Sequence, residues 1–152
     1  MKVIIMCGIS GSGKTTWVNA HKPTAVVCSA DNFFMSDDGA YRFDASKLPK
    51  AHAQCLRKYV DNLLLSTPTI VVDNTNTTIE EIAPYVALAQ AYGYEIELVE
   101  IRCSVSMAHI RDVHNVPVFA LRAMASRVAS LSFPPYWNIR RTIVKTDGKV
   151  ES

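Results

Sequence analysis

The chain has 152 residues, a length at which one hydrophobic core can hold a single domain, so we expect one domain over residues 1–152. Apolar residues make up 49% of the chain and charged residues 20%, a balance that excludes a disordered or collagen-like protein. The net charge of +2 is uneven, because residues 1–101 hold 8 Lys/Arg against 11 Asp/Glu and residues 102–149 hold 8 against 2. The basic C-terminal third suits a polyanion such as a triphosphate or a nucleic acid, although a solvated basic surface would have the same composition.

The sequence carries no membrane or disulfide signal. No apolar run approaches the roughly 20 residues that cross a bilayer, and the apolar opening at residues 3–7 is too short for a signal-peptide core. The four cysteines form no CxxC pair and have no histidine at the spacing of a zinc site. We therefore expect a cytoplasmic protein that binds no membrane, needs no obligate protein partner and keeps its cysteines as buried free thiols.

Strand and helix patterns alternate along the chain. Apolar, β-branched runs predict strands at residues 3–6, 25–28, 70–72, 96–101 and 139–144. Apolar spacing of three to four residues, with end signals such as a Thr three residues before a Glu in residues 77–81, predicts helices at residues 15–20, 46–65, 78–92, 104–115 and 118–131. This order predicts an α/β three-layer sandwich around a mainly parallel sheet, with a small helical lid at about residues 104–131.

A phosphate-binding loop follows the first strand. Residues 8–16 match the pattern G-x-x-x-x-G-K-[ST] and stand between a predicted strand and a predicted helix. Glycines let backbone amides converge on phosphate oxygens, and the following helix directs its positive end at the same anion. Lys14 is predicted to reach the β- and γ-phosphates as a catalytic cation, and Thr15 is predicted to ligate Mg²⁺. The predicted nucleotide-binding residues of the loop are Gly8, Ser10, Gly11, Ser12, Gly13, Lys14, Thr15 and Thr16.

A carboxylate follows the second predicted strand. In residues 29–34, Asp31 comes at a strand end that should face the phosphate loop, since ligands of such folds bind beyond the carboxyl ends of the strands. A carboxylate in that position can orient an attacking hydroxyl group and accept its proton. We therefore predict Asp31 as a catalytic and substrate-binding residue; the alternatives are that it caps the next segment or holds Mg²⁺ through water.

Polar residues also follow the third predicted strand. Asp73 after an apolar strand resembles the acidic residue that holds Mg²⁺ in P-loop proteins, so we predict it as a metal ligand with Thr15. Asn74 and Asn76 are short polar groups at the same edge of the sheet and are predicted substrate contacts. Thr77 is predicted to cap the helix that follows.

Arginines stand in the two helices of the predicted lid. A guanidinium group there can neutralise charge on a transferring phosphoryl group, and Arg111 is the first candidate. Arg122 is predicted to bind nucleotide, with Arg127 behind it, and a surface salt bridge is the alternative for each arginine. His114 is interpreted as a lid-positioning or core residue, because Asp31 already fills the role of a base.

These motifs together, in this order, resemble the polynucleotide 5′-hydroxyl kinase family, which includes phage-type end-healing kinases and related predicted AAA-type kinases. The similar segments are the loop at residues 8–16, the strand-end Asp motif at 29–33, the Asp-Asn-Thr-Asn motif at 73–76 and the lid motif at 111–117 with 122–124. The resemblance implies a P-loop NTPase fold, ATP and Mg²⁺ as cofactors, and Asp31 as the general base toward a 5′-hydroxyl group. Two positions differ, since the phage-type enzymes have a substrate-binding Arg in place of Phe34 and an Asp in place of Asn74.

The sequence thus predicts an ATP- and Mg²⁺-dependent kinase that transfers the γ-phosphoryl group to a hydroxyl group, with the 5′-end of a nucleic acid as the expected acceptor. A kinase for a nucleoside, a modified DNA base, a sugar or an antibiotic is the first alternative. An NTP-binding switch module that acts through a partner is the second. The sequence contains no NKxD-type guanine motif, which argues against a GTPase version of the switch.

Overall fold

The computed structural model describes residues 1–146 and 150–151, which form a central sheet with the strand order β2-β3-β1-β4-β5-β6. The first five strands pair in parallel, and β6 pairs antiparallel with β5. The strands are β1 (Lys2–Cys7), β2 (Val26–Cys28), β3 (Thr69–Val72), β4 (Glu95–Arg102), β5 (Arg140–Lys145) and β6 (Val150–Glu151). All five predicted strands are present, and the short β6 is an addition that the sequence pattern did not predict.

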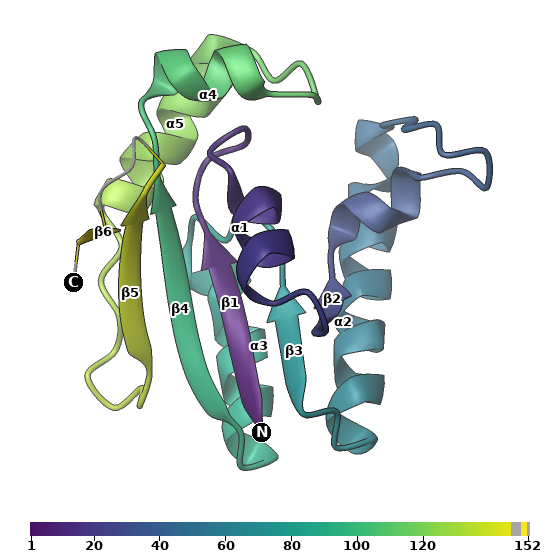
Figure 1. Ribbon diagram of the computed structural model, residues 1–152, viewed down its shortest axis with the longest axis vertical. Helices are drawn as coiled ribbons and strands as arrows, with labels where there is room; N and C mark the ends of the chain where they lie inside the picture. Colours follow the sequence, from purple (N-terminus) through teal and green to yellow (C-terminus); the bar gives the residue numbers. More distant parts are fainter. Residues whose placement is uncertain (147–149, 152) are drawn as a thin grey trace.

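In the described part of the chain, five helices connect the strands in the predicted order. They are α1 (Lys14–His21), α2 (Leu48–Leu64), α3 (Ile79–Ala91), α4 (Val105–Arg111) and α5 (Val118–Ala129). Two short 3₁₀ turns, Ala30–Phe34 and Ala45–Lys47, lie between β2 and α2. Figure 1 shows α4 and α5 together beyond the carboxyl ends of β1 and β4; both helices lie in the segment predicted as the lid, at about residues 104–131.

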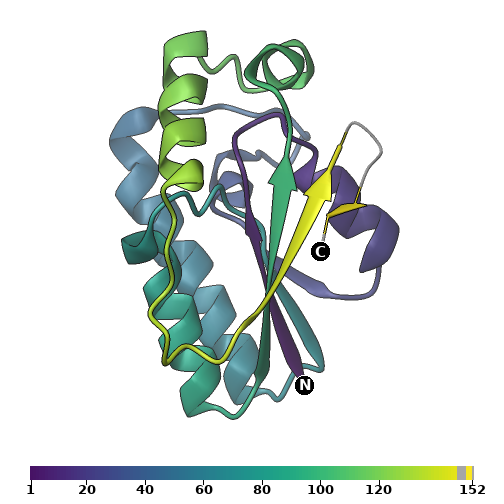
Figure 2. The ribbon, with the colours of Figure 1, turned by 90° about the vertical axis from the view of Figure 1, so that its left-hand side faces the viewer.

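The helices cover the sheet on both faces. Helix α1 lies on one face, and α2, α3 and α5 lie on the other (Figure 2). Side chains of β1 alternate between the two: Ile4 and Met6 pack in the cluster that contains Val18 of α1, whereas Val3 and Ile5 pack in the larger cluster under α2 and α3. Burial on both faces explains why the central strands are continuously apolar, and the predicted three-layer sandwich is confirmed.

Two helix ends differ from the prediction. Helix α3 is capped by Thr78, whose hydroxyl accepts a hydrogen bond from the Glu81 amide at 3.2 Å, so the prediction that Thr77 provides the cap is wrong. Helix α4 ends at Arg111 rather than at residue 115. The chain leaves the helix there because the Asp112 carboxylate accepts hydrogen bonds from the amides of His114 and Val116, which replace helical bonds.

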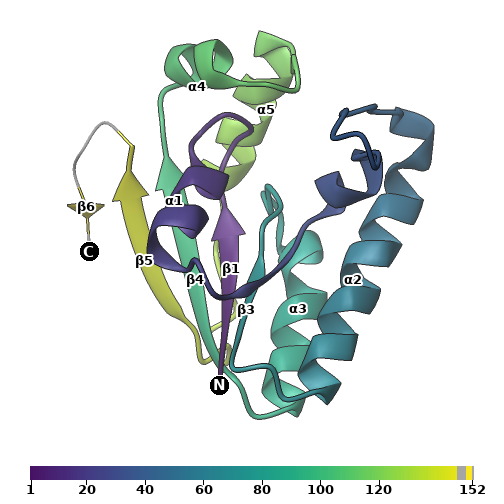
Figure 3. The ribbon, with the colours of Figure 1, turned by 45° about the vertical axis from the view of Figure 1, so that its right-hand side comes forward.

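The parallel order brings the carboxyl ends of β1, β2 and β3 to one edge of the sheet, with the phosphate loop between them and the lid (Figure 3). No helix among the described residues is long and apolar enough to cross a membrane. All four cysteines are free thiols; Cys7, Cys28 and Cys55 are buried as predicted, while Cys103 is only partly buried.

Candidate functional site

The loop between β1 and α1 is shaped by glycines at positive φ. Gly11 has φ 78° and Gly13 has φ 105°, values that a side chain strongly disfavours. A Cβ atom added to Gly11 would stand 2.2 Å from the Ala108 carbonyl oxygen, so α4 of the lid packs directly on the loop backbone. Ser12 is fully buried in this loop, and its hydroxyl has no hydrogen-bond partner among the described residues.

Lys14 is buried beneath the loop and directs its ammonium group into the site. Its Nζ donates to the carbonyl oxygens of Gly8 at 3.0 Å and Ile9 at 2.8 Å. Burial lowers the pKa of Lys14, while the nearby carboxylate of Asp73 opposes that shift. Both of these hydrogen bonds go to carbonyl oxygens, and a buried cation held in this way is a strong attractor for phosphate anions.

Thr15 and Asp73 form a pair of oxygen ligands at the start of α1. The Thr15 hydroxyl donates to Asp73 Oδ2 at 2.8 Å. Asp73 is buried directly after β3, and that burial raises its pKa, while the Thr15 hydrogen bond and Lys14 partly oppose the shift. A hydroxyl and a carboxylate beside a phosphate loop are the hard oxygen donors that Mg²⁺ prefers, so these residues fit the metal.

Asp31 lies in the 3₁₀ turn after β2, on the other side of the same cavity. Its side chain remains 55% exposed, and each of its oxygens faces one neighbour. Tyr41 donates its hydroxyl to Oδ1 at 3.2 Å, and His114 Nε2 stands 3.6 Å from Oδ2. Burial and the Asp31 charge raise the pKa of Tyr41, so this phenol stays protonated and keeps its role as donor.

The two asparagines after β3 have different positions. Asn74 lines the cavity, and its Oδ1 accepts the Ala30 amide at 2.9 Å, so it ties the β3 edge to the turn that carries Asp31. Asn76 is 1% exposed, adopts φ 47°, and donates to the Met6 carbonyl at 2.8 Å. The structure therefore directs Asn76 into the protein and away from the cavity that holds Asp31.

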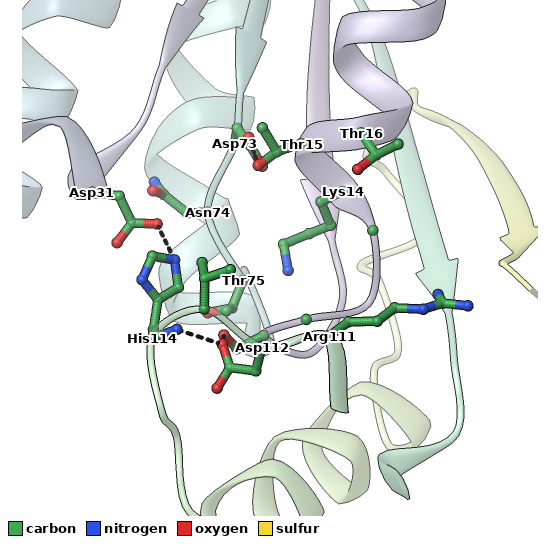
Figure 4. A pocket seen from close by; sticks show the side chains of 14 residues that line it. Lys14, Thr15, Thr16, Asp31, Asp73, Asn74, Thr75, Arg111, Asp112 and His114 are labelled. Atoms are coloured by element: carbon green, nitrogen blue, oxygen red, sulfur yellow. Dashed lines mark hydrogen bonds and ion pairs between the residues drawn. The ribbon is translucent and has the colours of Figure 1, made fainter. Parts of the chain in front are cut away.

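The lid arginines are arranged unequally. Arg111 lines the cavity, but its guanidinium donates to the Thr146 hydroxyl at 3.2 Å and points away from Lys14 (Figure 4). Arg127 donates to the Thr77 hydroxyl at 2.9 Å, which joins α5 to the start of α3. Arg122 is exposed on α5 and does not line the cavity, so the structure does not bring this predicted nucleotide contact to the loop.

Asp112 joins the lid to the phosphate loop, a role that we did not predict. Its Oδ1 accepts a hydrogen bond from the Ser10 hydroxyl at 2.9 Å, and the same carboxylate accepts the amides of His114 and Val116 in the turn after α4. Although partial burial works against the charge, the bonds from the amides of Val116 and His114 and from Ser10 lower the pKa of Asp112. The local signal for its turn was present in the Asp-x-His-Asn-x-Pro sequence, but its contact with Ser10, 102 residues away, had none.

These residues enclose one cavity of about 360 Å³ (Figure 4). From the predicted set, the lining includes Ser10, Gly11, Gly13, Lys14, Thr15, Thr16, Asp31, Asp73, Asn74 and Arg111. Gly8 and Ser12 belong to the loop without lining the cavity, and Asp112, Val113 and His114 complete the wall on the lid side. The cavity thus combines an anion cradle, a pair of metal-type oxygen ligands and a separate carboxylate.

The sequence is similar to known proteins. The family described as AAA domain matches residues 3–114, which is more than half of the chain. Human NEDD4-binding protein 2 is 31% identical over 97 residues, which make up 62% of this chain and 5% of that protein. The chain therefore corresponds to only a small part of that relative.

Solved structures share the fold at low sequence identity. A chain of the Pnkp1/Rnl/Hen1 RNA repair complex has a TM-score of 0.70 at 17% identity, over 90% of this chain and 48% of that one. An AvrRxo1-ORF1:AvrRxo1-ORF2 structure with sulphate ions has a TM-score of 0.67 at 18% identity, over 99% of this chain and 56% of that one. A gluconokinase from Sinorhizobium meliloti 1021 has a TM-score of 0.52 at 16% identity, over 94% of this chain and 82% of that one. The chain has the fold of these three structures, and it belongs to the AAA domain family.

Proposed function

We propose that this protein is an ATP- and Mg²⁺-dependent kinase that phosphorylates a hydroxyl group, with the 5′-hydroxyl end of a polynucleotide as the acceptor. The observation that carries the proposal is the shared cavity, in which the Asp31 carboxylate stands opposite the loop that carries Lys14. A module that only binds NTP needs no carboxylate at this position, whereas a carboxylate there can activate an attacking oxygen. An AvrRxo1-ORF1:-ORF2 structure with ATP, with a TM-score of 0.63, has the same fold and supports ATP as the donor.

The proposed step is an in-line transfer. Asp31 accepts the proton of the acceptor hydroxyl group, whose oxygen forms a bond to the γ-phosphorus as the bond to the β–γ bridging oxygen breaks and ADP leaves. Lys14 and the amides at Gly11 and Gly13 hold the phosphates. Thr15 and Asp73 would hold Mg²⁺, which supplies charge neutralisation on the β- and γ-oxygens. Arg111 is the proposed cation on the lid side, and it would have to turn from Thr146 to contact the phosphates.

The surroundings of Asp31 support an acceptor that carries bases and phosphates. Tyr41 is half-buried against His114, and Phe43 next to it is 53% exposed, so an aromatic surface lies beside the base. Bases stack on exposed aromatic rings with little sequence preference. Phe34 itself is buried, but its carbonyl oxygen accepts the Arg42 amide at 2.9 Å. The exposed Arg42 guanidinium lies on the same loop and forms a surface ion pair with Asp38 at 3.7 Å, which a backbone phosphate would have to replace. The chain of the RNA repair complex with the same fold agrees with this acceptor class.

The test is a phosphoryl-transfer screen. The protein is incubated with ATP labelled at the γ-phosphate, Mg²⁺ and single-stranded DNA or RNA oligonucleotides that end in a 5′-hydroxyl group. We expect label on the oligonucleotide and none on matched oligonucleotides whose 5′-end is already phosphorylated. The absence of label from every oligonucleotide would remove the polynucleotide assignment.

A small-molecule hydroxyl group is the second candidate acceptor. Phe34 favours it, because this buried ring cannot contact a backbone phosphate as an arginine would. A parallel panel of nucleosides and sugars therefore belongs in the same screen. Label on a small acceptor alone would move the assignment to that class, whereas ATP hydrolysis with no labelled acceptor would favour a switch module.

A further inference from the structure

The turn after α4 is fixed to the phosphate loop. Asp112 accepts the Ser10 hydroxyl at 2.9 Å and the Val116 amide at 2.7 Å, so one carboxylate holds both the loop and the turn. The close approach of Ala108 to Gly11 adds a direct backbone contact between the same two segments. A phosphate that moves the loop will therefore move this turn with it.

The same turn reaches the proposed base. His114, two residues after Asp112, places Nε2 at 3.6 Å from Asp31 Oδ2 (Figure 4). Its ring lies against the ring of Tyr41, with centroids 4.5 Å apart, and Tyr41 donates to the other oxygen of Asp31. The His114 Nδ1 atom is buried and has no hydrogen-bond partner among the described residues. In the neutral ring only one nitrogen carries a proton. A proton on Nδ1 would be a buried N–H group with no acceptor, so the proton is expected on Nε2, which faces the Asp31 carboxylate.

We propose that His114 is a positioning residue, and that Asp112 and His114 together transmit closure of the lid on the phosphate loop to the carboxylate of Asp31. We call this pair the lid link. The proposal rests on the proposed function, because it assigns Asp31 as the base, and it adds a path by which a bound triphosphate sets the position of that base.

The physical need for such a link follows from the exposure of Asp31. A carboxylate that is half in water samples several rotamers, whereas a general base must lie within about 2.6–3.2 Å of the hydroxyl group that it activates. A misplacement of about 1 Å can cost roughly 100-fold in rate. The Tyr41 hydroxyl holds one oxygen of the carboxylate at 3.2 Å, and the His114 ring faces the other oxygen, with Nε2 at 3.6 Å. Only His114 belongs to the lid.

The kinetic test compares two replacements of His114. His114→Phe keeps a ring against Tyr41 and removes the donor, whereas His114→Gln keeps an N–H donor at a similar reach. We expect His114→Phe to lower kcat for phosphoryl transfer about 10- to 100-fold, with the KM for ATP within about twofold of wild type, and His114→Gln to recover most of the rate. Equal rates for His114→Phe and wild type, or equal losses in the two variants, would overturn the proposal.

A second kinetic arm asks whether His114 acts through Asp31. In an Asp31→Asn background, measured in single turnovers at high enzyme concentration, His114→Phe should cause no further loss. A further loss as large as that in the wild-type background would show an independent role for His114 and would refute the lid link.

A binding arm does not depend on activity. The ring signals of Tyr41, assigned with Tyr41→Phe, are followed by NMR while a non-hydrolysable ATP analogue and Mg²⁺ are added. We expect these signals to shift in the wild type, and to stay unchanged in Asp112→Ala at saturating analogue; Asp37→Ala, an exposed loop substitution, should behave as wild type. An equal shift in Asp112→Ala, or no shift in wild type, contradicts the lid link. If wild type transfers phosphate to no hydroxyl group, the proposed function fails, while the NMR arm still decides the link.

Discussion

Asp31 is the residue on which the choice between phosphoryl transfer and simple nucleotide binding depends. It lines the cavity from the β2 side but does not belong to the loop that surrounds Lys14. We predict that Asp31→Asn lowers the rate of phosphoryl transfer at least 100-fold, because the amide cannot accept the proton, a role that contributes roughly 10²–10⁴-fold. The affinity for ATP, measured by titration calorimetry, should change by less than about threefold.

The matched control for Asp31 is Asp37→Asn, an exposed aspartate in the same connection between β2 and α2. This control should keep the wild-type rate. Retention of the full rate by Asp31→Asn would refute its role as base, and a parallel collapse of ATP affinity would show that Asp31 serves nucleotide binding instead.

Lys14 is the residue at which function and stability oppose each other. Its pKa is lowered by burial, so the folded state disfavours the charged form, and at neutral pH burial of that charge costs stability. We predict that Lys14→Met weakens ATP binding roughly 10- to 100-fold, the value of one or two charge-assisted hydrogen bonds. The melting temperature without nucleotide should not fall, because an apolar chain of similar volume replaces a buried cation. A marked fall in that temperature would contradict this account of Lys14.

At the scale of elements, the contact of α4 with the phosphate loop can be isolated with glycines. Gly11 and Gly39 have similar backbone angles, φ 78° and 82°, so an alanine at either position causes a similar strain of roughly 1–2 kcal/mol. Only at Gly11 would the new Cβ meet a neighbour, the Ala108 carbonyl at 2.2 Å, whereas Gly39 has nothing within 4 Å. We predict that Gly11→Ala abolishes phosphoryl transfer and that Gly39→Ala keeps it.

The measurement is the difference between the two alanine variants, in chemical denaturation and in transfer rate. Because Ala108 belongs to the lid, the loss at Gly11 should exceed the shared backbone strain, and the lid should lose protection from hydrogen exchange. Equal behaviour of the two variants would mean that the lid does not rest on the loop in solution.

Elements with a strong local pattern could be predicted from the sequence, and their ends could not. The apolar runs of the five parallel strands and the period of α2 are local signals, and both were confirmed. The end of α4 depends on which polar side chain accepts hydrogen bonds from the amides that follow the helix. Asp112 accepts them, and the helix therefore ends at Arg111 instead of at the predicted residue 115. β6 consists of two residues, too short for any periodic signal.

The candidate site divides in the same way. The phosphate loop lies in one contiguous motif, so the position of its residues in the fold could be predicted. The contacts of Asp112 with Ser10 and of His114 with Asp31 join segments 102 and 83 residues apart, and no local pattern reports them. Asn76 was predicted beside Asn74, but its positive φ turns its amide toward the Met6 carbonyl.

At the scale of the whole molecule, the proposed nucleotide site draws on the ends of two neighbouring strands. The loop follows β1 and Asp73 follows β3, and both strands share one sheet and its buried core. A ligand that bridges these ends binds only the folded chain, so it should stabilise the domain as a unit. We predict that ATP with Mg²⁺ at about 100 times its Kd adds about 2.7 kcal/mol, or roughly 5–10 °C in melting temperature for a domain of this size.

The part of this rise in melting temperature that depends on Mg²⁺ can be measured with a substitution of Asp73. Because its carboxylate and the Thr15 hydroxyl are the oxygen pair at the mouth of the loop, removal of Mg²⁺ with a chelator should reduce the ATP-induced shift in wild type by about half or more. In Asp73→Asn the amide oxygen can still accept the Thr15 hydrogen bond but no longer offers a charge to the cation. This variant should therefore keep the shift caused by ATP alone and lose the increment from Mg²⁺. An Mg²⁺ increment of wild-type size in Asp73→Asn would mean that another group holds the metal.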